Sequence, residues 1–166
     1  VMDGLVEGNL GTPDVSKLRE GKVTYDASRF RKYTELCRRV GMEGPHVINS
    51  AGPNLVKSAL GITADLTKGQ WPTEVTAGVQ AIAKAAVAAT ADIPAKWYYY
   101  GVDEPTGDNT YAIQDYQAWH DGGARTYATF YVPSFLEKAS AYLSAPCFVV
   151  GLVSNEKRAQ EAREAC

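Results

Sequence analysis

The sequence lacks the patterns that mark nucleic-acid-binding and membrane proteins. Its 17 basic and 19 acidic side chains give a net charge of -2 and are mixed along the chain. The sequence therefore contains no cluster of basic residues of the kind that binds a nucleic-acid backbone. No apolar run is long enough to span a bilayer, and no polybasic segment marks a membrane surface. We therefore expect no nucleic-acid partner and no membrane insertion.

Residues that ligate metals and motifs that bind cofactors are also scarce. The chain has three cysteines without metal-ligand spacing, and neither His46 nor His120 has a second imidazole or thiol nearby in sequence. No glycine-rich phosphate loop, dinucleotide fingerprint or GxSxG elbow follows any expected strand. We therefore expect no metal and no cofactor, and phosphate and acyl-transfer chemistry are disfavoured.

What the chain does contain is an alternation of short apolar stretches with amphipathic segments. Expected strands cover 2–10, 44–49, 96–102, 125–131 and 146–153, and expected helices cover 30–40, 73–92, 109–121, 134–143 and 155–165. This alternation predicts βαβ units and a parallel sheet in a single α/β domain over 1–166. The stretch 50–72 is polar and contains glycine, and we expect a long loop there after a strand.

Two architectures fit this order of elements. A (β/α)8 TIM barrel needs roughly 250 residues, so these 166 residues would form only part of one, whereas a flavodoxin-like doubly wound sheet would be complete. We expect part of a TIM barrel with parallel strands, with the flavodoxin-like sheet as the alternative. Because the sequence begins with Val1, we expect a fragment of a larger barrel. The remainder of the barrel or another chain would then cover the open strand edges.

Two adjacent carboxylates stand where the stretch KWYYYGVDEP leaves its apolar strand. Consecutive strand side chains point to opposite faces, so Asp103 and Glu104 share a pocket only where the strand breaks. Pro105 supplies that break and is expected to hold Glu104 in an extended or polyproline conformation. The neighbouring carboxylate and the apolar strand favour the protonated form of Glu104. A glycosidase needs such a protonated acid beside the leaving oxygen, so the pair indicates glycoside chemistry.

Other candidate site residues follow the expected strands, since both architectures place function at the C-terminal ends of their strands. We expect the substrate-binding residues to be Asn49, Trp71, Tyr131 and Asn155. Aromatic faces stack against the C–H faces of sugars while amides and carboxylates bind the hydroxyls, so the expected partner is a carbohydrate. Trp71 has the alternative role of a core residue, and Asn155 that of a helix cap.

The stretch YYYGVDEP, with the asparagine-containing loop and amphipathic helix after it, resembles the Asp-Glu strand end of β-N-acetylgalactosaminidases and related glycoside-hydrolase-like TIM barrels. That family works by substrate assistance, which implies Glu104 as general acid/base and Asp103 as the residue that holds the acetamido nitrogen of a 2-acetamido sugar. The motif is also similar to the Asn-Glu-Pro of many retaining glycosidases, from which Asp103 departs. There too Glu104 would be the acid/base. The resemblance implies an enzyme, a glycosidase, and favours a secreted or extracellular protein.

Two other functions stay open from the sequence. One is a non-catalytic carbohydrate-binding or structural protein on a degenerate glycosidase barrel, which would not need Glu104 to titrate. The other is a doubly wound regulatory or binding domain in which Asp103, Glu104 and Asp108 hold Mg²⁺. The Mg²⁺ reading is the weaker one, because such a site needs carboxylates from more than one strand and the other strand ends offer Asn, Ser and Tyr.

Overall fold

The computed structural model describes residues 5–9, 11–50, 52–148 and 160. The strands are β1 (Leu5–Asn9), β2 (Thr12–Asp14), β3 (Thr24–Asp26), β4 (His46–Asn49), β5 (Trp97–Tyr100), β6 (Thr126–Phe130) and β7 (Ala145–Phe148). The α-helices are α1 (Ser28–Arg39), α2 (Pro53–Leu60), α3 (Thr73–Thr90), α4 (Thr110–Asp121) and α5 (Pro133–Ala139), with short 3-10 helices η1 (Leu18–Glu20) and η2 (Ser140–Tyr142). The helix expected over 155–165 lies outside the described residues. Within them, no helix combines the length and hydrophobicity that a membrane span requires.

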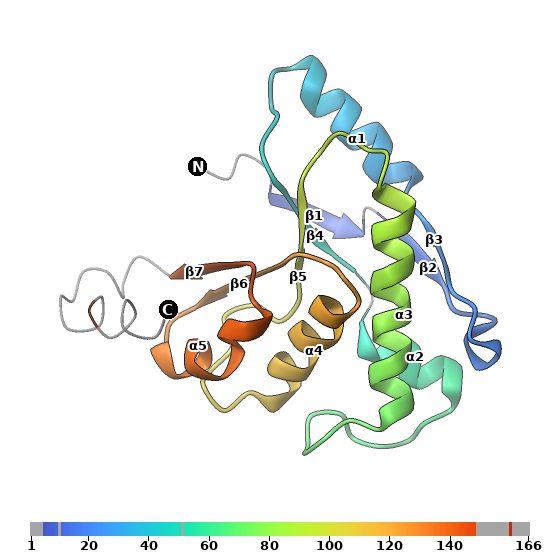
Figure 1. Ribbon diagram of the computed structural model, residues 1–166, viewed down its shortest axis with the longest axis vertical. Helices are drawn as coiled ribbons and strands as arrows, with labels where there is room; N and C mark the ends of the chain where they lie inside the picture. Colours follow the sequence, from blue (N-terminus) through green and yellow to red (C-terminus); the bar gives the residue numbers. More distant parts are fainter. Residues whose placement is uncertain (1–4, 10, 51, 149–159, 161–166) are drawn as a thin grey trace.

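The main sheet is parallel throughout, as the alternation of elements predicted. Its strand order is β1-β4-β5-β6-β7, and each neighbouring pair is parallel. Figure 1 shows these strands side by side in the order in which the chain reaches them. A flavodoxin-like sheet has the order 2-1-3-4-5, with a reversal after its first strand. The described sheet has no such reversal, so its order differs from that alternative.

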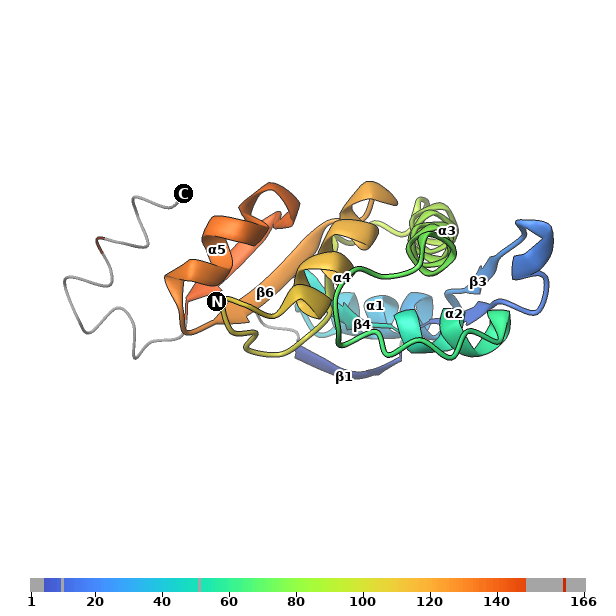
Figure 2. The ribbon, with the colours of Figure 1, turned by 90° about the horizontal axis from the view of Figure 1, so that it is seen from below.

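The helices that pack against the sheet lie on one of its faces. Figure 2 shows α3, α4 and α5 together on one side, with β1 on the opposite side of the molecule. The main core joins Val79 of α3, Tyr99 of β5 and Trp119 of α4, and the Tyr99 and Trp119 rings stack with centroids 3.9 Å apart. Helix α1 packs on the same face, because its Phe30 contacts Ile48, the neighbour of Tyr99 in the strand register.

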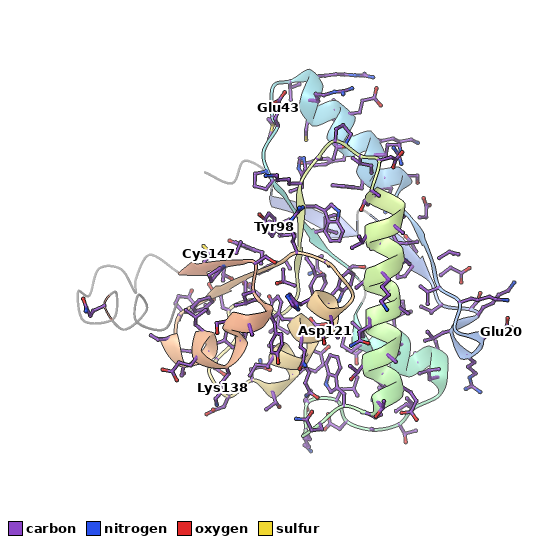
Figure 3. All side chains as sticks on the ribbon, in the orientation of Figure 1. Glu20, Glu43, Tyr98, Asp121, Lys138 and Cys147 are labelled. Carbon is purple, nitrogen blue, oxygen red and sulfur yellow. The ribbon has the colours of Figure 1, made fainter. Side chains whose placement is uncertain are left out.

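The residues that alternate with this core point to the other face of the sheet. Tyr98 and Tyr100 flank Tyr99 on β5, and Tyr127 and Thr129 lie between the core residues of β6. Tyr100 and Tyr127 meet there with ring centroids 5.5 Å apart. Tyr98 is labelled on β5 in Figure 3. This face therefore carries a row of phenols and hydroxyls that leads to the C-terminal ends of β5 and β6.

The prediction of a long loop over 50–72 is wrong, because this stretch contains helix α2. The helix has Pro53 in its first turn and is followed by Gly61 with φ 69°, which are ordinary start and stop signals. Its Val56 is fully buried, and a Cβ added at Gly78 of α3 would overlap that side chain. Close packing on α3 therefore stabilises a helix of only eight residues.

Candidate functional site

Asp103 lies just beyond the end of β5, where two strands hold its carboxylate. The Tyr100 hydroxyl of β5 donates to Asp103 Oδ1, and Thr129 Oγ1 of β6 donates to the same oxygen at 3.2 Å. The two hydroxyl oxygens are themselves 2.7 Å apart. Burial, helped by the hydrogen bond to Asp103, raises the pKa of Tyr100 to about 12, so this phenol remains a donor at neutral pH. The exposed carboxylate of Asp103 is thus positioned by two hydroxyl groups, one 3 and the other 26 residues away along the chain.

Glu104 has a backbone conformation that the sequence did not predict. Its φ is 46°, and it is the one non-glycine residue with positive φ in the described part of the chain. The expectation that Pro105 holds it extended is therefore wrong: the chain turns sharply here and buries Pro105. A left-handed non-glycine residue costs on the order of 1–3 kcal/mol and often marks a functional site. The Glu104 carboxylate, followed by burial, raises the pKa of the exposed Tyr131 hydroxyl, so these two side chains lie close together.

The loop after the acid pair is anchored to the neighbouring helices. Lys138 Nζ of α5, labelled in Figure 3, donates to Asp108 Oδ1 at 2.6 Å. A Cβ added at the buried Gly107 would overlap Ser134, also on α5, so loop and helix pack closely. Asn109 Oδ1 caps α4 by accepting from the Ala112 backbone N–H at 3.0 Å. The close packing of Gly107 and the cap from Asn109 hold the chain on the C-terminal side of Glu104, while the exposed Asp108–Lys138 ion pair contributes little.

The three carboxylates considered for Mg²⁺ are not gathered into one site. Asp103 is bound by Tyr100 and Thr129, and Asp108 by Lys138. Across the described ranges, no group of three His, Cys, Asp or Glu side chains is arranged to hold a metal ion. The Mg²⁺ reading therefore has no geometric support in this part of the chain.

Trp71 lies in the core. Its side chain is 6 % exposed, its Nε1 donates to the Leu66 carbonyl at 3.0 Å, and its ring meets Tyr111 edge-on with centroids 5.2 Å apart. Its backbone N–H also donates to Gln114 Oε1 at 2.7 Å. The prediction of Trp71 as a stacking platform is corrected here, because both faces of a ring buried in this way are unavailable to a sugar.

The remaining predicted site residues have different placements. Tyr131 is 44 % exposed beside Glu104, just after the end of β6, so it is accessible to a ligand. Asn49 is exposed and is the last residue of β4, the strand that pairs directly with β5. Asn155 lies outside the described residues. The structure therefore brings Asp103, Glu104 and Tyr131 together and places Asn49 at the same edge of the sheet.

A further carboxylate, missed by sequence reasoning, lies at this edge. Asp115 of α4 is 2 % exposed, and the Tyr99 hydroxyl donates to its Oδ2 at 2.7 Å. Its Oδ1 is buried with no hydrogen-bond partner. Burial raises the pKa of Asp115 to about 7, and the hydrogen bond from Tyr99 opposes part of that rise. A signal was available, because Asp115 stands on the apolar stripe of α4 with Ala112 and Trp119.

Asp115 lines a cavity of about 160 Å³ between the ends of β4 and β5. The cavity is lined by the β4 end and the start of α2, by part of β5 and the residues after it, and by two residues of α4: Asn49, Ser50, Gly52, Pro53, Asn54, Tyr99, Gly101, Val102, Tyr111 and Asp115. Because Gly101 and Val102 directly precede Asp103, the cavity lies next to the acid pair along the chain.

We expect Asp115 to make the stability of the fold depend on pH. The folded state keeps the Asp115 proton up to about pH 7, whereas a carboxyl group with its ordinary pKa of 3.8 loses it earlier in the unfolded chain. Its contribution is therefore fully present below about pH 4 and is lost as the pH rises to about 7. The phenols of Tyr99, Tyr111 and Tyr116 all have raised pKa values and stay neutral in this range.

Urea unfolding of the wild type and Asp115→Asn across this pH range measures the effect. The free energy of unfolding of the wild type, minus that of the variant, should fall from about pH 4 to about pH 7 and then level off. Taking the difference removes the opposite pH dependence of the exposed carboxyl groups with lowered pKa values, such as Asp26 and Asp92. A difference that stays constant with pH would show that Asp115 ionises normally in the folded state.

Searches of protein-family models, curated proteins and solved structures found no match to this chain. Function is therefore inferred from the groups that the fold brings together. These are a carboxylate held by hydroxyls of two strands, a second carboxylate on a constrained backbone, and an accessible phenol. Such groups are suited to hydrogen bonding with a hydroxylated ligand and to proton transfer.

Proposed function

We propose that this chain is part of a glycoside-hydrolase-like (β/α)8 barrel that acts on 2-acetamido sugars, with Glu104 as general acid/base and Asp103 as its partner. The observation that carries the proposal is the position of Asp103, held by Tyr100 and Thr129 where β5 and β6 end. Both partners stand on the sheet face that points away from the helices. In a (β/α)8 barrel that face is the interior, and catalytic residues come from the C-terminal ends of its strands.

The strand order supports the barrel part of the proposal. In a (β/α)8 barrel every strand pairs with the next one along the chain, and the described sheet has this order from β1 to β7. Strands β1 and β7 form its two edges. The remaining strands of the barrel, from the same polypeptide or from another chain, would pair with these edges. They would then enclose the sheet face that carries Tyr100.

The proposed mechanism assigns a separate task to each carboxylate. Glu104 gives its proton to the leaving-group oxygen as the bond to the anomeric carbon breaks. Asp103 accepts a hydrogen bond from the acetamido N–H, so that the acetamido oxygen attacks the anomeric carbon from the other side. Glu104 then takes a proton from the water that opens this cyclic intermediate. Hydroxyl donors from Tyr100 and Thr129 suit Asp103 to its role as a fixed acceptor.

A non-catalytic carbohydrate-binding or structural protein on a degenerate barrel is the second candidate. It is favoured by the exposure of both Asp103 and Glu104 in the described structure. Water stabilises the charged form of a carboxyl group, whereas a general acid must hold its proton near neutral pH. The accessible Tyr131 would serve this binding function equally well.

Hydrolysis of a panel of aryl glycosides by the full-length protein distinguishes the two candidates. The enzyme proposal predicts turnover of N-acetylhexosaminides and little or none of the matching hexosides, because the acetamido group supplies the nucleophile. Asp103→Asn should lower that turnover and leave thermal stability nearly unchanged, since Asp103 is exposed. No turnover of any sugar by a folded protein would reject the enzyme and leave the second candidate.

A further inference from the structure

The carboxyl group of Asp115 is incompletely satisfied inside the fold. Tyr99 supplies one donor, at Oδ2, while Oδ1 is buried without a partner. None of the ion pairs in the described residues involves Asp115. A buried acceptor that lacks a donor is destabilising, so native proteins rarely keep one without a reason.

Gly52 leaves space beside the unpaired oxygen. A Cβ added at Gly52 would lie 3.6 Å from Asp115 Oδ1 and 3.6 Å from the Tyr99 hydroxyl. The φ of Gly52 is -104°, so this glycine is not in the left-handed region. At these ordinary contact distances, the absence of a side chain at Gly52 leaves space next to both oxygen atoms.

The rest of the cavity wall suits a polar guest. It offers the amides of Asn49 and Asn54 and the hydroxyls of Ser50 and Tyr111, and no Lys or Arg lines it. The Asp115 carboxyl group therefore has no cationic partner from the described chain within the cavity. At about 160 Å³ the space admits a small polar group rather than a long side chain.

We propose that this cavity is a binding recess for a hydroxyl or ammonium group of a small polar molecule, which donates a hydrogen bond to Asp115 Oδ1. The guest satisfies the buried acceptor, while Asn49, Ser50 and Asn54 bind its other polar atoms. An ammonium group adds a favourable charge interaction when Asp115 is ionised, and a hydroxyl group does not require ionisation. The recess goes beyond the proposed hydrolysis, because it binds such groups whether or not Glu104 is catalytic.

Titration of the full-length protein with methylammonium chloride and, separately, ethylene glycol tests the recess, with NMR shifts of the cavity-lining residues as the readout. At least one probe should bind, and its affinity should fall about 10- to 100-fold in Asp115→Asn. Gly52→Ala should weaken the same binding while the Tyr99–Asp115 hydrogen bond remains. Asp121→Asn, a half-exposed aspartate on the same helix, is the matched control and should bind like the wild type.

The two probes separate the possible guests. Methylammonium binding that strengthens from about pH 5 to about pH 8 identifies an ammonium site, and ethylene glycol binding in the same residues identifies a hydroxyl site. No shift of the lining residues with either probe overturns the proposal, as does binding that both Gly52→Ala and Asp115→Asn leave unchanged. Neither result depends on the glycoside assay, so a failed hydrolysis proposal and a failed recess are distinguishable.

Discussion

Replacing Glu104 by glutamine is expected to lower kcat on an aryl 2-acetamido glycoside by about 10²- to 10⁴-fold, the usual contribution of a general acid/base. Glutamine keeps the size of the side chain but can neither donate a proton to the leaving oxygen nor accept one from water. Because Glu104 is exposed, the thermal midpoint should change little. Steady-state kinetics with the full-length protein, beside a thermal unfolding scan, measure both quantities.

The matched control for this variant is Asp108→Asn. Asp108 lies on the same loop and is exposed, but its carboxylate pairs with Lys138 and has no task in the proposed mechanism. Its removal should leave kcat within about twofold of the wild type, because a surface ion pair contributes little. If Glu104→Gln retains activity, or if Asp108→Asn loses as much, Glu104 is not the acid/base.

Replacing Trp119 by alanine is expected to lower the free energy of unfolding by about 3–5 kcal/mol, the usual cost of removing a large buried aromatic side chain. Trp119 is 1 % exposed and stacks on Tyr99 with an angle of 9° between the ring planes. Its loss leaves a cavity between α4 and β5, directly behind the tyrosine that donates to Asp115. A typical domain has only about 5–15 kcal/mol of stability, so the variant should be strongly destabilised.

Urea unfolding of the full-length protein followed by circular dichroism measures this loss. Leu36→Ala is the control, because Leu36 of α1 is 56 % exposed and its truncation should change stability by no more than about 0.5 kcal/mol. Equal stabilities of Trp119→Ala and Leu36→Ala would show that the stacked pair is not part of the folded core.

Helices and strands whose signals are local were predicted well. The helix expected over 109–121 is α4, because Asn109 caps it through a contact only three residues along the chain. The expected strand over 96–102 contains β5, since an apolar run bounded by a turn is informative without knowledge of its neighbours. Helix α2 was missed although Pro53 and Gly61 mark its ends, because much of its stability comes from the contact between Val56 and Gly78.

The function of individual aromatic and acidic residues was harder to predict. Trp71 looked available for stacking on a sugar, and its burial depends on Tyr111 and Gln114, about 40 residues further along. Asp115 was not predicted as a site residue, because it lies within a helix. Its burial beside Tyr99 and Gly52 arises only where α4 packs against β5 and the start of α2. The burial of Trp71 and that of Asp115 both depend on contacts between segments that are distant in sequence. The spacing of hydrophobic residues along the chain does not indicate such contacts.

By itself, the sequence determined that the chain is α/β and that Asp103 and Glu104 follow a strand, because periodicity and turn residues act over a few neighbours. Tertiary structure alone decided which groups meet that pair. Parallel pairing of β5 with β6 brings Thr129 to Asp103, and the turn into buried Pro105 sets the positive φ of Glu104. The packing of α4 against β5 encloses Asp115 on the helix-covered face of the sheet, where Tyr99 donates to it. The contacts of Thr129 with Asp103 and of Tyr99 with Asp115 form only when the chain folds, since they join segments that no local rule relates.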